Sequence, residues 1–172
     1  GLEEVVEKTV RAGRLKFTTD LAPAIREARA VFIAVGTPPL PDGKADLSFV
    51  RQVAESIGDN LNGYKVIVTK STVPVGTGQM VERAVREHSG GKQEFAVVSN
   101  PEFLREGSAI EDFLRPDRVV IGARTQRAID VMLDIYAPLK AAGVPFVVAN
   151  VESAEMIKYA SNAFLAVKIS FI

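Results

Sequence analysis

The sequence predicts an α/β protein in which helices cover both faces of a doubly wound, mostly parallel sheet, and one long helix follows at the C-terminus. The first observation is that short apolar runs alternate with amphipathic segments along most of the chain, which is typical of parallel strands joined by helices. The second is that residues 30–35 and 95–98 are continuously apolar, as strands buried on both faces are. The third is the helical spacing of apolar side chains from residue 151 to residue 172.

The individual elements follow from apolar periodicity and from the residues that cap or break it. We expect helices at residues 2–12, 21–29, 46–60, 77–88, 108–114, 126–139 and 151–172. We expect strands at residues 15–18, 30–35, 65–69, 95–99, 118–122 and 144–148. Asp20 and Thr77 are in position to cap the helices that follow them. The last strand should lie at an edge of the sheet, because Pro145 cannot donate a hydrogen bond to a neighbouring strand.

Composition narrows the classes of function. The chain has 172 residues, enough for one domain with a core. Its 21 basic and 21 acidic residues cancel, so nothing favours a nucleic-acid or membrane-surface partner. The absence of cysteine excludes disulfides, thiolate metal ligands and a cysteine nucleophile within these residues, and no other side chains have metal-ligand spacing. We expect no metal site, no membrane span, and the cytoplasm as the default location.

Two carboxylates follow the predicted strand at residues 95–99. Asn100 and Pro101 favour the start of a short helix, on which Glu102 and Glu106 would share one face. Carboxylates just past the carboxyl end of a strand are in the usual place for chemistry in an open α/β sheet. The alternative is that Glu102 only complements the positive end of the helix.

Two further loops should lie at the same edge of the sheet. The loop at residues 36–43 offers backbone amides, Thr37 and a stiff pair of prolines, and Ser71 and Thr72 add hydroxyl groups after the next strand. The helix that opens at Thr77 could hold an anion at its N-terminus. A plain connecting loop and simple capping are the alternatives. Because the carboxyl ends of parallel strands meet at one edge, the loops at 36–43, 70–76 and 99–107 should converge.

The C-terminal helix carries two stripes of side chains. Its apolar stripe consists of Ile157, Ala160, Phe164, Val167 and Phe171. Its polar stripe consists of Glu155, Lys158 and Asn162. If the helix crosses the ligand edge, Lys158 and Asn162 face the same site as Glu102, where an amine could stabilise a developing alkoxide or order a water molecule. If it lies outside the sheet, Glu155 and Lys158 form an ordinary surface ion pair.

Five motifs in order resemble the UDP-glucose dehydrogenase family of nucleotide-sugar 6-dehydrogenases. They lie at residues 35–38, 70–77, 100–107, 116–122 and 162–166, and the resemblance covers essentially the whole chain. It implies a Rossmann-like NAD-binding domain at residues 1–150, truncated at its N-terminal strands, and the start of the long connecting helix at residues 151–172. It also implies NAD as cofactor and two oxidations at C6 of the sugar, which convert UDP-glucose into UDP-glucuronate.

The resemblance assigns roles to residues by their positions in these motifs. The implied cofactor-binding residues are Val35, Gly36, Thr37, Pro38, Pro39, Ser71, Thr72 and Glu106. The implied substrate-binding residues are Glu102, Phe103, Leu104, Arg105, Glu106, Lys158 and Asn162. The implied catalytic residues are Thr72, which would help hold the hydrolytic water, Glu102 as acid/base, Glu106 near nicotinamide and substrate, Lys158 as the amine that steadies oxyanions, and Asn162 beside it.

Several parts of the family pattern are not in this sequence. The family's glycine-rich turn, its nucleophilic cysteine and the domain that grips the uridine nucleotide have no counterpart here, so we expect an internal fragment with a cut N-terminus that is inactive alone. The resemblance also implies a homodimer through the C-terminal helix. The alternatives are the same chemistry on GDP-mannose or a UDP-N-acetyl-hexosamine, and a non-catalytic nucleotide-binding module of the same fold.

Overall fold

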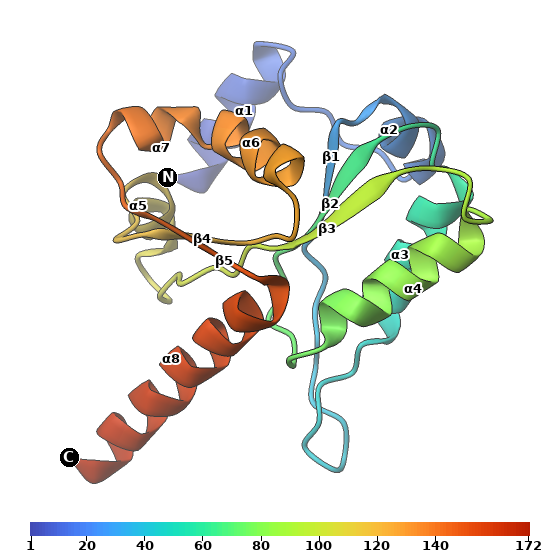
Figure 1. Cartoon of the computed structure of the whole chain (residues 1–172). Coiled ribbons are helices and arrows are strands. Elements are labelled where there is room, and N and C mark those ends of the chain that lie inside the picture. The colour runs from blue at the N-terminus through green and yellow to red at the C-terminus, as the bar shows by residue number, and fades with distance from the viewer.

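The computed structural model describes residues 1–172 and contains one five-stranded sheet (Figure 1). Its strands are β1 (Ala30–Ile33), β2 (Lys65–Thr69), β3 (Phe95–Ser99), β4 (Val119–Gly122) and β5 (Phe146–Ala149), in the spatial order β1-β2-β3-β4-β5. Three of the four strand pairs are parallel, and only β3 and β4 are antiparallel. The predicted mostly parallel sheet is therefore confirmed, as is the position of β5 at an edge.

The antiparallel junction gives the sheet an unusual centre. β3 and β4 share a single pair, Ser99 with Gly122, and each of these is the last residue of its strand. The sheet therefore has two halves, β1 to β3 and β4 with β5, whose strands run in opposite directions and meet at their carboxyl ends. Figure 1 shows the two halves extending in different directions from this meeting point. The carboxyl ends of the central strands consequently come together in the middle of the molecule.

Eight helices surround this sheet. They are α1 (Leu2–Arg11), α2 (Leu21–Glu27), α3 (Ser48–Asp59), α4 (Thr77–His88), α5 (Ala109–Leu114), α6 (Gln126–Ile135), α7 (Ala137–Ala141) and α8 (Val151–Phe171). Asp20 caps α2 as predicted, accepting a hydrogen bond from the Ala22 amide. Thr77 is instead the first residue of α4, and its hydroxyl donates to the Pro74 carbonyl at 2.7 Å.

The sheet has an apolar core on each face. On one face, α3 and α4 pack on the side chains of Ile33 and Ile67. On the other, α6 packs on Val66, Val68 and Ile121. Alternate residues of β2 thus enter opposite cores, and all five of its residues are buried. This two-sided burial explains why continuous apolar runs predicted β2 and β3 with their observed bounds.

Three sequence-based elements differ from the structure. Residues 15–18 form no strand: they pair with no other strand, and Phe17 remains 76 % exposed. Residues 101–105 form an irregular segment rather than a helix, because the side chain and carbonyl of Glu102 are engaged by other groups described below. The helix predicted at 126–139 is divided into α6 and α7 at Tyr136, whose side chain is buried.

The long helix α8 begins beside the meeting point of the two halves of the sheet and points away from it (Figure 1). The Asn150 side chain caps it by accepting a hydrogen bond from the Ser153 amide at 2.7 Å. Only its first turns are buried, at Val151, Ala154, Glu155 and Lys158. None of the helices combines the length with the apolar composition that crossing a membrane requires.

Candidate functional site

The three loops after β1, β2 and β3 converge, as the sequence predicts. The Thr37 hydroxyl donates to the Thr72 carbonyl at 2.9 Å, and the Ser71 hydroxyl donates to the Val35 carbonyl at 2.7 Å. These two bonds join the first loop to the second. The Lys70 ammonium group lies 3.2 Å from the Asn100 side-chain oxygen and so joins the second loop to the third.

Glu102 and Lys158 form the centre of the site. The Lys158 ammonium donates to the Glu102 backbone carbonyl at 2.6 Å and to its carboxylate at 2.9 Å. The other carboxylate oxygen accepts from the Leu104 amide at 2.6 Å. Lys158 is 6 % exposed, so its charge is held in a largely dry environment by this one carboxylate. The structure thus supports the interpretation in which α8 crosses the ligand edge.

The surroundings of Glu102 favour its ionised form. Burial raises the pKa of this carboxyl group, but the Leu104 amide, Lys158 and Lys70 together outweigh that effect and leave the pKa below its usual value. A carboxylate next to an ammonium group can accept a proton from a reacting hydroxyl group or water molecule, and the ammonium can stabilise negative charge on oxygen. The pair therefore has the means for proton transfer and oxyanion stabilisation in one place.

A buried polar cluster beneath this pair was not predicted from the sequence. Asn100 is 1 % exposed, and its side-chain oxygen accepts hydrogen bonds from both Lys70 and the Tyr136 hydroxyl, the latter at 2.6 Å. Its side-chain amide donates to the Val120 carbonyl at 2.8 Å. Burial lowers the pKa of Lys70 to about 8. No local pattern could connect Asn100 with Tyr136, because they come together only through the packing of α6 on the sheet.

Glu155 has a role that local spacing concealed. Its carboxylate does not pair with Lys158 but accepts hydrogen bonds from the Gly76 and Gly78 amides, both at 2.7 Å, at the N-terminus of α4. The predicted anion at this helix N-terminus is therefore a side chain of the chain itself. Burial raises the pKa of Glu155 even though both amides act in the opposite direction. The result is that α8 is fixed to α4 one turn before Lys158.

A cavity of about 380 Å³ opens beside Glu102. Its walls include Lys70, Asn100 and Glu102, together with Phe103 and Arg118. The Arg118 guanidinium stacks 4.6 Å from the centre of the Phe103 ring, which stiffens this wall. The cavity is large enough for a small polar ligand and places the Glu102 side of the pair within its reach.

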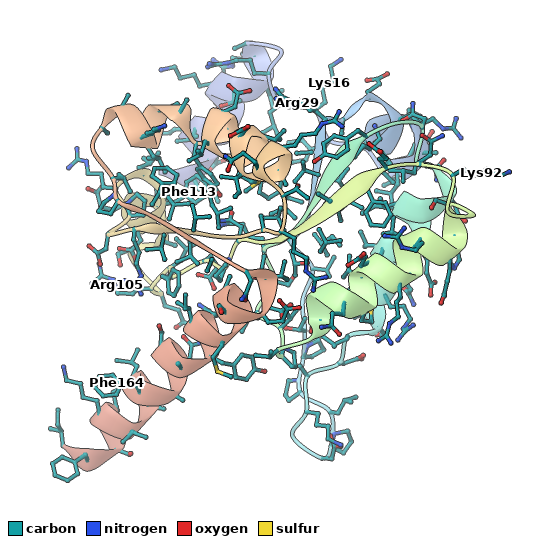
Figure 2. All side chains as sticks on the ribbon, viewed as in Figure 1. Lys16, Arg29, Lys92, Arg105, Phe113 and Phe164 are labelled. Carbon is teal, nitrogen blue, oxygen red and sulfur yellow. The ribbon has the colours of Figure 1, made fainter.

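Arg105 also lines the cavity but is already engaged. Its guanidinium and backbone amide bind the Asp112 carboxylate, with the closest contact at 2.7 Å. Figure 2 shows Arg105 at the surface of the molecule on the side of α5. This ion pair ties residues 103–108 to α5 and so fixes one side of the cavity.

Other residues that the resemblance singled out have fewer contacts. Glu106 is exposed in a turn and forms no ion pair. Because residues 101–105 are not helical, the prediction that Glu102 and Glu106 share a helix face is wrong. Leu104 is exposed, and Asn162 is exposed one turn beyond Lys158, where its side chain forms no hydrogen bond. The Thr72 side chain is half-buried, and its hydroxyl group makes no hydrogen bond within the chain.

The edge formed by the first two loops fits part of a dinucleotide. A methyl group added at Gly36 would meet nothing within 4 Å, so the backbone there is open to a close approach. Pro38 and Pro39 are exposed next to it. The N-terminus of α4 is filled by Glu155 and so offers no phosphate site. The residues present therefore suit contact with a part of the dinucleotide other than its pyrophosphate.

The fold and the site define a class of protein: an α/β nucleotide-binding domain with an ion-paired carboxylate and amine at the carboxyl ends of its strands. Residues 1–140 match the family model described as "UDP-glucose/GDP-mannose dehydrogenase family, NAD binding domain". The chain therefore belongs to the UDP-glucose/GDP-mannose dehydrogenase family, and these residues are its NAD-binding domain.

Relatives with established names agree with this placement. The UDP-glucose 6-dehydrogenase TuaD of Bacillus subtilis is 54 % identical over 172 residues, which is the whole of this chain and 37 % of that protein. The UDP-glucose 6-dehydrogenase of Rhizobium meliloti is 54 % identical, over all of this chain and 40 % of that protein. The chain thus spans about two fifths of the length of these relatives.

Solved structures show the same arrangement. A UDP-glucose dehydrogenase from Pyrobaculum islandicum superposes with a TM-score of 0.93 at 50 % identity, covering 99 % of this chain and 40 % of that one. A GDP-mannose dehydrogenase from Pseudomonas aeruginosa superposes with a TM-score of 0.92 at 36 % identity, with the same coverage.

Proposed function

We propose that the protein carrying this chain oxidises UDP-glucose at C6 to UDP-glucuronate with NAD, by two successive oxidations and a hydrolytic step. The observation that carries the proposal is the Glu102–Lys158 pair, in which the ammonium lies 2.9 Å from the carboxylate beside the cavity. The 54 % identity to two UDP-glucose 6-dehydrogenases supports UDP-glucose as the sugar nucleotide. The domain limits that accompany this proposal are residues 1–150 for the nucleotide-binding part and 151–172 for the connecting helix.

In this proposal, each residue of the pair has a separate task. As the C6 hydroxyl group gives up its proton to the Glu102 carboxylate and hydride leaves C6, negative charge develops on the oxygen, and the Lys158 ammonium stabilises it. In the hydrolytic step, the Glu102 carboxylate takes a proton from the attacking water, and the free hydroxyl of Thr72 helps to hold that water. Asn162, one turn along α8, and Glu106 complete the set on the substrate side.

NAD supplies the hydride acceptor when it is bound. One side of NAD would be held by the first loop, through Val35, Gly36, Thr37, Pro38 and Pro39. Ser71 and Thr72 from the second loop would also contact the cofactor, and Glu106 would lie near its nicotinamide. The hydrogen bonds that join the two loops support this role, because they fix the edge before the cofactor binds. Phe103, Leu104 and Arg105 would line the path of the sugar nucleotide, which the cavity wall at Phe103 and Arg105 supports.

We also propose that the protein is a homodimer whose subunits meet through α8. The outer half of this helix is apolar on more than one side and bare: Phe164 is 72 % exposed and Val167 is 65 % exposed. Figure 2 shows Phe164 projecting from α8 away from the rest of the molecule. A helix apolar around its circumference is normally buried, and a second copy of α8 would provide the cover. Light scattering that finds only monomers would contradict this.

The cytoplasm is the location that goes with this proposal, because the charged sugar nucleotide and NAD do not cross membranes unaided. The product would serve nucleotide-sugar metabolism and polysaccharide synthesis.

The test is an assay of the protein that carries this chain with UDP-glucose and NAD, following NADH by absorbance and UDP-glucuronate by chromatography. We expect two NADH per product. GDP-mannose and a UDP-N-acetyl-hexosamine are the competing substrates, and faster turnover of either would assign the protein to that branch.

The Glu102→Gln variant separates an enzyme from a non-catalytic binding module. We expect it to lose turnover or to accumulate the covalent acyl intermediate that the hydrolytic step resolves, which in the family forms on the nucleophilic cysteine. Glu87→Gln, at an exposed position on α4 outside the site, is the control and should keep wild-type turnover. Wild-type turnover in Glu102→Gln would contradict the assignment of the acid/base.

A further inference from the structure

Lys70 is a charged residue of the site to which the family motifs assign no role. It follows β2 directly, and its backbone amide donates to the Ile33 carbonyl at 2.9 Å. Its side chain reaches toward the third loop and lines the same cavity as Glu102. No carboxylate lies within ion-pair distance of its ammonium group, whose hydrogen-bond partners are the two oxygens of Asn100 at 3.2 and 3.4 Å.

The partner of Lys70 is held rigidly. Asn100 accepts from the Tyr136 hydroxyl, donates to the Val120 carbonyl, and binds the Thr69 carbonyl through its backbone amide at 2.9 Å. With every one of these groups engaged, Asn100 cannot turn to another partner without leaving a buried polar group unpaired. The position of the Lys70 ammonium is therefore set by the fold.

Asn100 is also two residues from Glu102, so the same contact fixes the start of the irregular segment that carries the carboxylate. Lys158 holds Glu102 from α8, and Lys70 holds the segment from β2. We propose that Lys70 is a positioning residue for Glu102, which anchors residues 100–102 through Asn100 and supplies the second positive charge that stabilises the Glu102 carboxylate. Its consequence for catalysis rests on the function proposed above.

Other ionisable groups around the cavity leave Lys70 in this role. They are Arg105, Glu111, Asp112, Arg115, Asp117 and Arg118. Two ion pairs, Arg105–Asp112 and Arg115–Glu111, neutralise four of them. Arg118 stacks on Phe103, and Asp117 is exposed to solvent. Tyr136 shares Asn100 with Lys70, and burial raises the pKa of its hydroxyl, so it stays neutral while Lys70 titrates.

The protonation of Lys70 should therefore control the basicity of Glu102. Burial lowers the pKa of Lys70 to about 8, and the nearby charge of Lys158 acts in the same direction, although Glu102 acts to raise it. Below that pH the ammonium favours the Glu102 carboxylate and weakens it as a base. Above it, the lysine is neutral, and Glu102 becomes a stronger base. The site would thus have a second titration near pH 8.

The test is a carbon-13 NMR titration of the Glu102 side-chain carboxyl group in the 172-residue chain. In the wild type, we expect a main step in the acid range and a second, smaller displacement near pH 8, when Lys70 loses its proton. Lys70→Met should raise the Glu102 pKa by roughly 0.5 to 1 unit and remove the second step. Lys70→Arg, which stays charged, should keep the low Glu102 pKa and also lack the second step.

Lys65 provides a matched control on the same strand. It is buried at the other end of β2, where its ammonium donates to the Arg26 and Ala28 carbonyls at 3.0 and 2.7 Å. Lys65→Met should leave both steps of the Glu102 titration unchanged. An unshifted Glu102 pKa in Lys70→Met overturns the proposal. The absence of a step near pH 8 in the wild type overturns it as well, and needs no variant to fold.

These outcomes are independent of the proposed activity. A titration with the expected steps in a protein that oxidises no sugar nucleotide would reject the enzyme and keep the coupling of Lys70 to Glu102. If the protein oxidises UDP-glucose but its Glu102 titration does not respond to Lys70, the proposed enzyme is kept and the coupling is rejected. In an active protein, Lys70→Met should shift the pH profile of kcat while KM changes little, and Lys70→Arg should restore the profile below pH 8.

Discussion

Glu155 and Lys158 are three residues apart on α8 and have opposite charges, yet they bind different partners. Glu155 accepts from the Gly76 and Gly78 amides, and Lys158 donates to Glu102. Both side chains are less than a tenth exposed. The first turns of α8 are therefore attached at two separate points, one on the N-terminus of α4 and one on the loop after β3. This double attachment fixes where the Lys158 ammonium stands relative to the cavity.

The attachment at Glu155 predicts a stability effect. Glu155→Gln should lower the free energy of unfolding by about 1–3 kcal/mol, because the amide offers one acceptor oxygen where two backbone N–H groups point. Burial raises the pKa of Glu155, so the wild-type carboxylate carries a desolvation cost that the neutral variant lacks. This offsets part of the loss and places the expected value in the lower half of the range. Urea unfolding followed by circular dichroism near neutral pH measures it.

Glu152→Gln is the matched control for this experiment. Glu152 lies one turn earlier on α8 and pairs with Arg124 at the surface, where both side chains remain partly exposed. Its removal should cost no more than about 1 kcal/mol. If both variants lower the free energy of unfolding equally, the hydrogen bonds from the α4 amides stabilise the position of α8 no more than the surface ion pair does.

The second attachment predicts an effect on the reaction. Lys158→Met should lower kcat by about 100-fold or more in the protein that carries this chain, because the ammonium that stabilises the oxyanion is lost. KM should change less, because Lys158 meets charge that develops only as the alcohol reacts. Steady-state NADH formation measures both constants. Lys168→Met, at the exposed end of α8, is the control, and a tenfold rise in KM at constant kcat would assign Lys158 to substrate binding instead.

How far sequence reasoning reached depends on whether the deciding contacts were local. β2 and β3 were predicted with their observed bounds, because continuous apolar runs are buried on both faces and Asn100 ends the second of them. The convergence of three loops followed from parallel strand geometry alone. The pairing of Lys158 with Glu102 was left open by the sequence, since it depends on the direction in which α8 leaves the sheet.

The wrong predictions at residues 101–105 and at Glu155 arose where hydrogen bonds from distant parts of the chain override local sequence signals. Residues 101–105 have the local signals of a helix start, but Lys158 binds the Glu102 carbonyl that a helix would use, and Leu104 binds its side chain. Glu155 and Lys158 have the spacing of a helical ion pair, but two amides of α4 are better partners for the carboxylate. The sequence could not group Asn100, Tyr136 and Lys70, because each comes from a different part of the fold.

The Arg105–Asp112 pair predicts an acid-sensitive loop. Hydrogen bonds from Arg105 lower the pKa of Asp112 to about 2, below the value of about 3.9 in an unfolded chain. A carboxylate whose pKa is lowered by folding stabilises the protein above its unfolded pKa and loses that contribution as pH falls through the folded one. Asp112→Asn should therefore flatten the decline in urea midpoint between about pH 4 and pH 2. Glu111→Gln, in an exposed pair with Arg115, should leave that decline unchanged.

Gly122, where the two halves of the sheet meet, allows α8 to pack closely against β4. A Cβ atom at Gly122 would stand 2.4 Å from the Ala154 Cβ and 2.9 Å from the Asn150 carbonyl oxygen, so α8 could not keep its position. Gly122→Ala should destabilise the fold by roughly 1–3 kcal/mol and should weaken the Lys158–Glu102 contact as α8 moves outward. Urea unfolding measures the first effect, and the Glu102 carboxyl titration measures the second as a rise in its pKa. Gly36→Ala, where an added methyl group meets nothing within 4 Å, is the control for both. A Gly122→Ala variant as stable as Gly36→Ala would mean that α8 can shift without cost, and that its close seat on β4 does not hold Lys158 in place.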